Sequence, residues 1–169
     1  MGSGWIMELW DLYDKNRKKT DRVQIRGKQI PEGYYHIVVH VWIRNSKGLY
    51  LISQRSASRE KDPLIWETVG GSVLKGEDSL TGALREVFEE VGIKLNPNKG
   101  TIIKSMLREN YRDIVDVWLF HYDGDVDINN ATTDEVAQSK WMRKEEIKKM
   151  LEEGIFQDNL RYLFDTYGL

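Results

Sequence analysis

Residues 34–43, YYHIVVHVWI, form a nearly continuous run of aromatic and β-branched side chains. Apolar residues at consecutive positions, rather than at alternate ones, are typical of a strand that is covered on both faces. The run therefore predicts a central strand of a sheet. The sequence NSKG at residues 45–48 predicts a tight turn from this strand into a partner strand, LYLIS.

The other periodic segments mix strands and helices without strict alternation, which favours an α/β sandwich with a mixed sheet. Residues 79–91 have helical spacing, with apolar side chains at Leu80, Leu84, Val87 and Val91, and Gly92 follows as a stop signal. Residues 8–26 predict a hairpin, and residues 66–69 predict a strand. We also expect strands over residues 101–107, 114–122 and 136–142, and closing helices over residues 144–151 and 159–167.

The chain has 169 residues, enough for one hydrophobic core, so we expect a single domain over residues 1–169. The opening MGSG is typical of an added leader. Residues 1–6 are therefore expected to be added or disordered, with Met7 a candidate native start.

Charge and cysteine content exclude several classes of partner. The net charge is -2, and lysine and arginine are spread along the chain, so nothing predicts binding to nucleic acid. The apolar stretches are far shorter than the roughly 20 residues of a membrane span, and no signal peptide is visible. Cysteine is absent, which excludes disulfides and cysteine nucleophiles and fits a cytoplasmic setting. A small anionic partner and a homodimer both stay open.

The predicted helix carries three carboxylates on one face. At about 100° per residue, Glu86, Glu89 and Glu90 lie within an arc of about 100°, opposite the apolar side chains. Glu86 and Glu90 repel each other at i, i+4, and the helix dipole disfavours Glu89 and Glu90 in the last turn. Only Glu89 has an obvious counter-charge, in Arg85. Clustered carboxylates suit a hard cation such as Mg²⁺ or Mn²⁺, so the pattern leaves a metal site and a solvated face as alternatives.

Residues 71–93, GSVLKGEDSLTGALREVFEEVGI, resemble a complete Nudix box. That motif requires glycine, glutamate, the pair Arg-Glu, an aliphatic residue, the pair Glu-Glu, glycine and a second aliphatic residue at fixed spacing. Its nine places are filled here by Gly71, Glu77, Arg85, Glu86, Val87, Glu89, Glu90, Gly92 and Ile93. One mild departure is Gly82, where family members often have alanine; its cost is roughly 1 kcal/mol of helix propensity.

The resemblance implies an α/β/α sandwich and a metal-dependent hydrolase that cleaves a phosphoanhydride bond by attack of water on phosphorus. Glu86, Glu89 and Glu90 would ligate Mg²⁺ or Mn²⁺, with a main-chain carbonyl near Gly71 as a further ligand. The roles implied for the remaining positions are carried by three residues. Arg85 would orient carboxylates, Glu77 would brace the loop or join the outer metal shell, and Glu135, in a later loop, is our candidate for an additional base or ligand, against a structural or solvated role.

Outside the box, the order of features is similar to isopentenyl-diphosphate isomerase and its hydrolase-like relatives. True isomerases use a cysteine and a histidine before the box helix, and the matching positions here are Gly70 and Ser72. We therefore expect hydrolysis rather than isomerisation.

The same resemblance implies that Arg55 and Arg59 grip the diphosphate, for which the planar guanidinium is suited; a solvated loop position is the alternative. His36 aligns with a metal-ligating histidine and shares a strand face with His40. Since its partner ligand is lost at Ser72, we expect a hydrogen-bonded sheet histidine instead.

The substrate is not determined by the sequence. A nucleoside diphosphate linked to another group is the common theme of the resembled family, and Trp42, Trp66 or Trp118 could stack a base or serve as core. The third alternative, a sensor that binds nucleotides or metabolites without hydrolysis, is disfavoured by the complete box.

Overall fold

The computed structural model describes residues 7–165 and contains a seven-stranded mixed sheet. Its centre is β3 (His36–Arg44), as the apolar run predicts. β3 pairs in parallel with β8 (Asp113–His121) along its whole length. β8 in turn pairs antiparallel with β7 (Gly100–Arg108) at one edge. The predicted mixed sheet is therefore confirmed.

The two strands joined by the turn after β3 separate directly after that turn. The turn is the predicted one, with the Gly48 amide donating to the Asn45 carbonyl at 3.0 Å. However, β4 (Tyr50–Arg55) pairs with β3 only at Arg44 and Tyr50. β6 (Val69–Ser72) then occupies the place beside β3, and β4 pairs instead with β5 (Trp66–Glu67) and β9 (Val136–Met142).

The strand predicted over residues 66–69 is wrong in its extent, because β5 and β6 are separate strands with different partners. Thr68 lies between them, and its hydroxyl donates to the Val41 carbonyl of β3. This bond holds the chain where it crosses from β4 to β3. The crossing brings the loop after Ser72 beside the central strand, where the Val73 amide donates to the Ile37 carbonyl at 2.9 Å.

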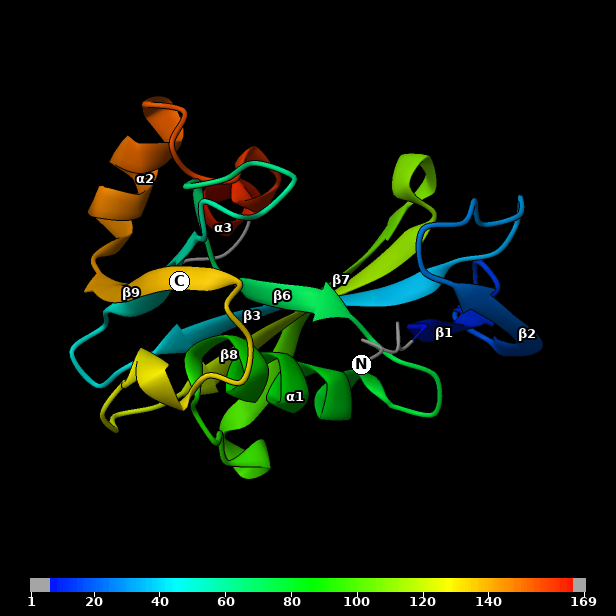
Figure 1. Ribbon diagram of the computed structural model, residues 1–169, viewed down its shortest axis with the longest axis horizontal. Coiled ribbons are helices and arrows are strands. Elements are labelled where there is room, and N and C mark those ends of the chain that lie inside the picture. The colour runs from blue at the N-terminus through cyan, green and yellow to red at the C-terminus, as the bar shows by residue number, and fades with distance from the viewer. Residues whose placement is uncertain (1–6, 166–169) are drawn as a thin grey trace, which may run out of the picture.

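Helices cover both faces of the sheet, as expected for a sandwich (Figure 1). α1 (Ser79–Val91) packs on one face, and α2 (Lys144–Glu152) and the short α3 (Tyr162–Asp165) pack on the other. α1 has the predicted bounds: the Asp78 side chain accepts the Thr81 amide at 2.7 Å at its start, and Gly92 ends it with φ 71°. The turn needs glycine there because left-handed backbone strains other residues.

The predicted N-terminal hairpin is confirmed as β1 (Leu9–Tyr13) and β2 (Lys19–Ile25), which form a separate two-stranded sheet. It lies at one end of the molecule in Figure 1. Trp10, Leu12 and Ile30 form a small core beneath it.

The C-terminal helix differs from its prediction. The chain forms a 3₁₀ turn at Asp158–Leu160 before α3, so one continuous helix does not begin at residue 159. Residues 166 and 167, and the predicted leader at residues 1–6, lie outside the described residues. Within residues 7–165, no helix combines the length and apolarity needed to cross a membrane.

Candidate active site

The three glutamates of α1 do not share one environment. Glu90 is 6% exposed and therefore turned into the protein. The side chain of Glu86 is 12% exposed and that of Glu89 is 35% exposed. A solvated outer face, the alternative that the sequence left open, is therefore excluded for Glu90.

Glycine at position 71 allows the helix to approach β6 closely. A Cβ atom on Gly71 would lie 2.2 Å from Glu86 Oε1. Any side chain at this position would therefore displace the carboxylate. The Nudix-box glycine and glutamate thus form one unit, a carboxylate held against main-chain atoms.

Arg85 contacts more of the site than the sequence indicated. Its Nη1 donates to both Glu86 (3.0 Å) and Glu89 (3.1 Å), whereas the helical spacing had indicated relief for Glu89 alone. Its Nε donates to Glu77 Oε1 at 2.7 Å, and its Nη2 donates to the Ser72 carbonyl at 3.0 Å. Arg85 therefore ties α1, the loop and β6 together.

Glu77 braces the loop that precedes α1. Its carboxylate accepts hydrogen bonds from Arg85, and its Oε2 also accepts one from the Leu74 amide at 3.0 Å. This placement matches the bracing role that the resemblance implied. A role of Glu77 in metal binding stays a prediction.

Burial raises the pKa of the two inner carboxyls. For Glu86, desolvation outweighs the attraction of Arg85 and raises the pKa to about 7. For Glu90, desolvation and the neighbouring charges of Glu86, Glu67 and Glu135 raise the pKa well above its ordinary range. Glu90 forms no hydrogen bond or ion pair with any residue between 7 and 165 that would offset this cost. Two such groups side by side favour a bound cation or a proton.

Glu135 reaches the site because its loop is attached to the end of α1. The Glu89 carbonyl accepts the amides of Thr132 (2.9 Å) and Thr133 (3.1 Å). Glu135 Oε1 then pairs with Arg59 Nη1 at 2.7 Å. The structure thus brings both predicted residues to the edge of the glutamate cluster.

These side chains enclose a pocket of about 220 Å³, which we call the carboxylate pocket. Its wall includes all three α1 glutamates and the predicted residues Gly71, Arg85, Arg59 and Glu135. Three of its residues, Arg26, Arg59 and Glu135, also line a larger hollow of about 710 Å³, the arginine pocket, together with Arg55 and Lys61.

Two residues near this pocket were missed from the sequence. Glu67 of β5 is partly buried, and desolvation raises its pKa despite its ion pair with Arg55 at 2.9 Å. An acidic residue inside a strand, between Trp66 and Thr68, is a signal that could have identified it. Arg26, at the end of the hairpin, has no such signal; it pairs with Glu8 at 2.7 Å in the pocket wall.

Arg55 lines the arginine pocket but already has protein partners. Its Nη1 donates to Glu67, and its Nε and Nη2 donate to the Lys61 carbonyl at 3.1 and 2.9 Å. Its role in binding the substrate stays a prediction.

The three tryptophans considered for base stacking are all core residues. Trp42 is 0% exposed, and Trp66 and Trp118 are each 8% exposed. Trp118 also donates to Ser79 Oγ at 2.9 Å. None of these three indoles offers an open ring face.

The donor set fits a hard divalent cation. It consists of carboxylate oxygens beside the Gly71 main chain, with no sulfur or imidazole among them. Within residues 7–165, however, no three His, Cys, Asp or Glu side chains converge closely enough to hold an ion as they stand. Glu86 and Glu89 both accept hydrogen bonds from Arg85 Nη1.

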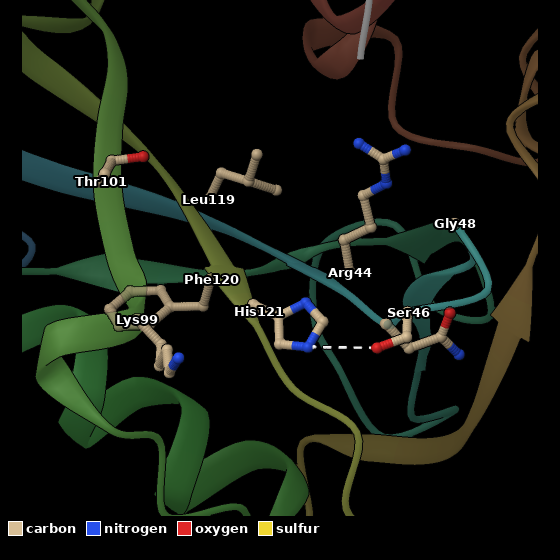
Figure 2. Close-up of a pocket in the computed structure, with 9 residues that line it drawn as sticks. Arg44, Ser46, Gly48, Lys99, Thr101, Leu119, Phe120 and His121 are labelled. Carbon is tan, nitrogen blue, oxygen red and sulfur yellow. Dashed lines mark hydrogen bonds between the residues drawn. The ribbon is translucent and has the colours of Figure 1, made fainter.

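A separate pocket of about 310 Å³ at the ends of β3 and β8 shares no residue with the glutamate site. Ser46, His121 and Asp123 form hydrogen bonds beside it. Figure 2 shows that Arg44 and Lys99 extend in opposite directions there. Its cationic groups therefore do not converge on a common ligand.

The histidines of β3 differ from each other. His40 is a hydrogen-bonded sheet histidine, 2.9 Å from Tyr162 Oη. His36 is equally buried and stacks on Trp10, but its Nδ1 forms no hydrogen bond with any of the described residues, contrary to expectation. The positions of the isomerase pair, Gly70 and Ser72, lie on β6 beside β3.

The comparisons with known proteins agree with this geometry. The NUDIX domain family matches residues 34–163. An uncharacterised Nudix hydrolase of Listeria monocytogenes is 38% identical over 153 residues, covering 89% of this chain and 88% of that protein. A shorter match, 29% identical, links 50% of this chain to 44% of an isopentenyl-diphosphate Delta-isomerase from Streptomyces coelicolor.

Among solved structures, a Deinococcus radiodurans protein superposes with a TM-score of 0.75 at 20% identity, covering 95% of this chain and 99% of that one. This likeness extends the agreement to the whole fold. With the family match over most of the sequence, the fold and the intact box lead to one conclusion: the chain belongs to the Nudix hydrolase family.

Proposed function

We propose that this chain hydrolyses a phosphoanhydride bond in an organic diphosphate, with Mg²⁺ or Mn²⁺ as its cofactor. The observation that carries the proposal is Glu90, a buried carboxyl that forms no hydrogen bond or ion pair with any of residues 7–165, next to Glu86 and the Gly71 main chain; the charge of Arg59 offsets its burial only in part. Such a group is costly to bury, and a divalent cation would offset that cost.

In this proposal Glu86, Glu90 and the Gly71 carbonyl hold the cation, and Glu89 joins from the rim. Arg85 acts as a positioning residue, because its contacts reach two of the ligands. A bound divalent cation would neutralise the diphosphate and lower the pKa of the attacking water.

The chain's own residues would bind the substrate and accept the proton of the attacking water. Arg59 and Arg26 line both adjoining pockets, so their guanidinium groups can bind phosphate oxygens as the substrate enters. Glu86, Glu90 and Glu135 are the carboxylates near enough to accept the proton of the attacking water. In the free protein, Glu135 is held by Arg59, so an incoming phosphate would compete for that arginine and release the carboxylate.

The test is hydrolysis of a substrate panel with Mg²⁺: nucleotide sugars, dinucleotides, ADP-ribose, nucleoside triphosphates and prenyl diphosphates. We expect phosphoanhydride cleavage of at least one class, and a loss of about 100-fold or more in kcat for Glu90→Gln. Glu152→Gln, an exposed position on α2, is the matched control and should match the wild type. The proposal fails if no anhydride is cleaved or if Glu90→Gln turns over at the wild-type rate.

A further inference from the structure

The N-terminal hairpin forms hydrogen bonds with the loop of the Nudix box, between β6 and α1. The Leu9 carbonyl of β1 accepts the Lys75 amide at 2.8 Å. Two residues further along β1, Asp11 Oδ2 accepts the Gly76 amide, also at 2.8 Å. Two neighbouring amides of the loop are therefore bound by a strand that lies outside the box.

These two amides are the central ones of a tight turn. The Glu77 amide donates to the Leu74 carbonyl at 3.0 Å and closes the turn, with Lys75 and Gly76 between them. Gly76 has φ 83°, the left-handed backbone that the third position of a type II turn requires. The closing bond uses only the Glu77 amide, so the amides of Lys75 and Gly76 need partners elsewhere. β1 supplies both partners.

Glu77, the last residue of this turn, connects it to the glutamates of α1. The Glu77 carboxylate accepts Arg85 Nε at 2.7 Å. Arg85 Nη1 in turn donates to Glu86 at 3.0 Å and to Glu89 at 3.1 Å. The position of the turn therefore determines where Glu77 meets Arg85, and Arg85 contacts two of the three carboxylates directly.

Asp11 is a buried carboxylate whose charge is compensated. Burial opposes its ionisation, but the Gly76 amide and the ammonium of Lys19 hold the pKa of Asp11 below its ordinary value. Lys19 Nζ lies 3.0 Å from the same Oδ2 atom. A hydrogen bond from an amide to a charged acceptor is stronger than one to a neutral acceptor, so Asp11 is suited to fix the turn.

The hairpin is itself held firmly against the sheet, so it can support the loop. At its tip, both terminal nitrogens of Arg17 donate to Asp116 of β8, whose side chain is fully buried. Next to the hairpin turn, the amides and carbonyls of Tyr13 and Tyr35 bond to each other at 2.8 and 2.9 Å. The hairpin therefore joins the central sheet to the loop that precedes α1.

We infer that Asp11 is a positioning residue of the active site. It holds the turn before Glu77 so that Glu77 orients Arg85, and through Arg85 the carboxylates of Glu86 and Glu89. The inference rests on the proposed function for the cation that these carboxylates would bind. It makes the N-terminal hairpin part of the catalytic architecture.

The first test is amide hydrogen exchange in the metal-free protein, followed by nuclear magnetic resonance. In the wild type, the Gly76 amide should exchange at least about 10-fold more slowly than in an unstructured chain. Asp11→Ala should remove most of this protection. Asp11→Asn should retain it, because its amide oxygen can still accept the Gly76 amide.

The second test is Mn²⁺ binding to the same proteins. Asp11→Ala should bind Mn²⁺ about 10-fold or more weakly than the wild type, and Asp11→Asn should recover most of the loss. Thr20→Val is the matched control, because it removes a hydrogen bond within the hairpin, from Thr20 Oγ1 to the Leu12 carbonyl at 2.8 Å, and leaves the loop contacts in place. It should bind Mn²⁺ as the wild type does.

An unprotected Gly76 amide in the wild type would overturn the inference, even if Asp11→Ala failed to fold. Unchanged Mn²⁺ affinity in Asp11→Ala would also overturn it. So would an equal loss in Thr20→Val, which would indicate a general effect of the hairpin, or an equal loss in Asp11→Asn, which would indicate the ion pair with Lys19. If the wild type binds no Mn²⁺, the proposed cation site fails, whereas faster exchange of the Gly76 amide in Asp11→Ala still supports the role of Asp11 in holding the loop.

Discussion

The buried carboxyl of Glu86 makes stability depend on pH in a direction opposite to that of most acidic residues. Its pKa in the folded protein is about 7, against 4.5 for an ordinary glutamate. Between these values the folded state keeps a proton that the unfolded state releases, so stability is lost as pH rises from 4.5 to 7. At 1.36 kcal/mol per pKa unit, the loss is about 3 kcal/mol.

Glu86→Gln removes this loss, because an amide of nearly the same shape cannot ionise. Relative to the wild type, we expect the variant to gain up to about 3 kcal/mol in free energy of unfolding between pH 4.5 and 7.5. The measurement is urea denaturation followed by tryptophan fluorescence, in a chelator so that no cation binds. Glu152→Gln should run parallel to the wild type over the same range. If Glu86→Gln also runs parallel to it, Glu86 does not carry the strain that we assign to it.

Other positions give further expectations. His40 is buried, and burial lowers its pKa to about 3. The free energy of unfolding should therefore fall by up to about 1.4 kcal/mol per pH unit as pH drops below 6.5. In His40→Phe this dependence on pH should be weaker, and an unchanged slope would contradict the assignment. Gly82→Ala should lower the free energy of unfolding in urea by about 1 kcal/mol despite alanine's higher helix propensity. The reason is that the added Cβ would lie 2.9 Å from Val73 Cγ2. A stabilised variant would show that the Val73 side chain can move aside. Gly71→Ala should displace the Glu86 carboxylate and lower kcat by about 10-fold or more, while the circular dichroism spectrum stays unchanged. Full activity would argue against the close contact between position 71 and the Glu86 carboxylate.

Local signals in the sequence were sufficient to predict where α1 begins and ends. Apolar spacing and the stop at Gly92 lie within or next to the helix, and the predicted bounds match the structure. The cap by Asp78 was not used in that prediction. The same holds for residues 136–142, where the predicted strand is β9.

Features that depend on strand pairing could not be predicted in the same way. β6 displaces β4 from most of β3, and Glu67 of β5 lies near enough to Glu90 for its charge to raise the pKa of Glu90. No local pattern states which strand lies beside which. The burial of Glu90 is a similar case, because a helical wheel gives a direction but not the loop that covers it.

Residue spacing predicts only some of the Arg85 contacts. Helical geometry predicts the pair with Glu89 at i, i+4, but the contacts with Glu77 and Ser72 depend on how the loop folds back over α1. The missing partner of His36 is likewise visible only in three dimensions.

The central claim is that the buried carboxylates of α1 are kept for a divalent cation, and direct binding of Mn²⁺ tests it. Electron paramagnetic resonance of free Mn²⁺ at pH 7.5 should show saturable binding to the wild type and to Glu152→Gln. Binding to Glu90→Gln should be weaker by about 10-fold or more. Equal affinity of Glu90→Gln and the wild type would contradict the claim.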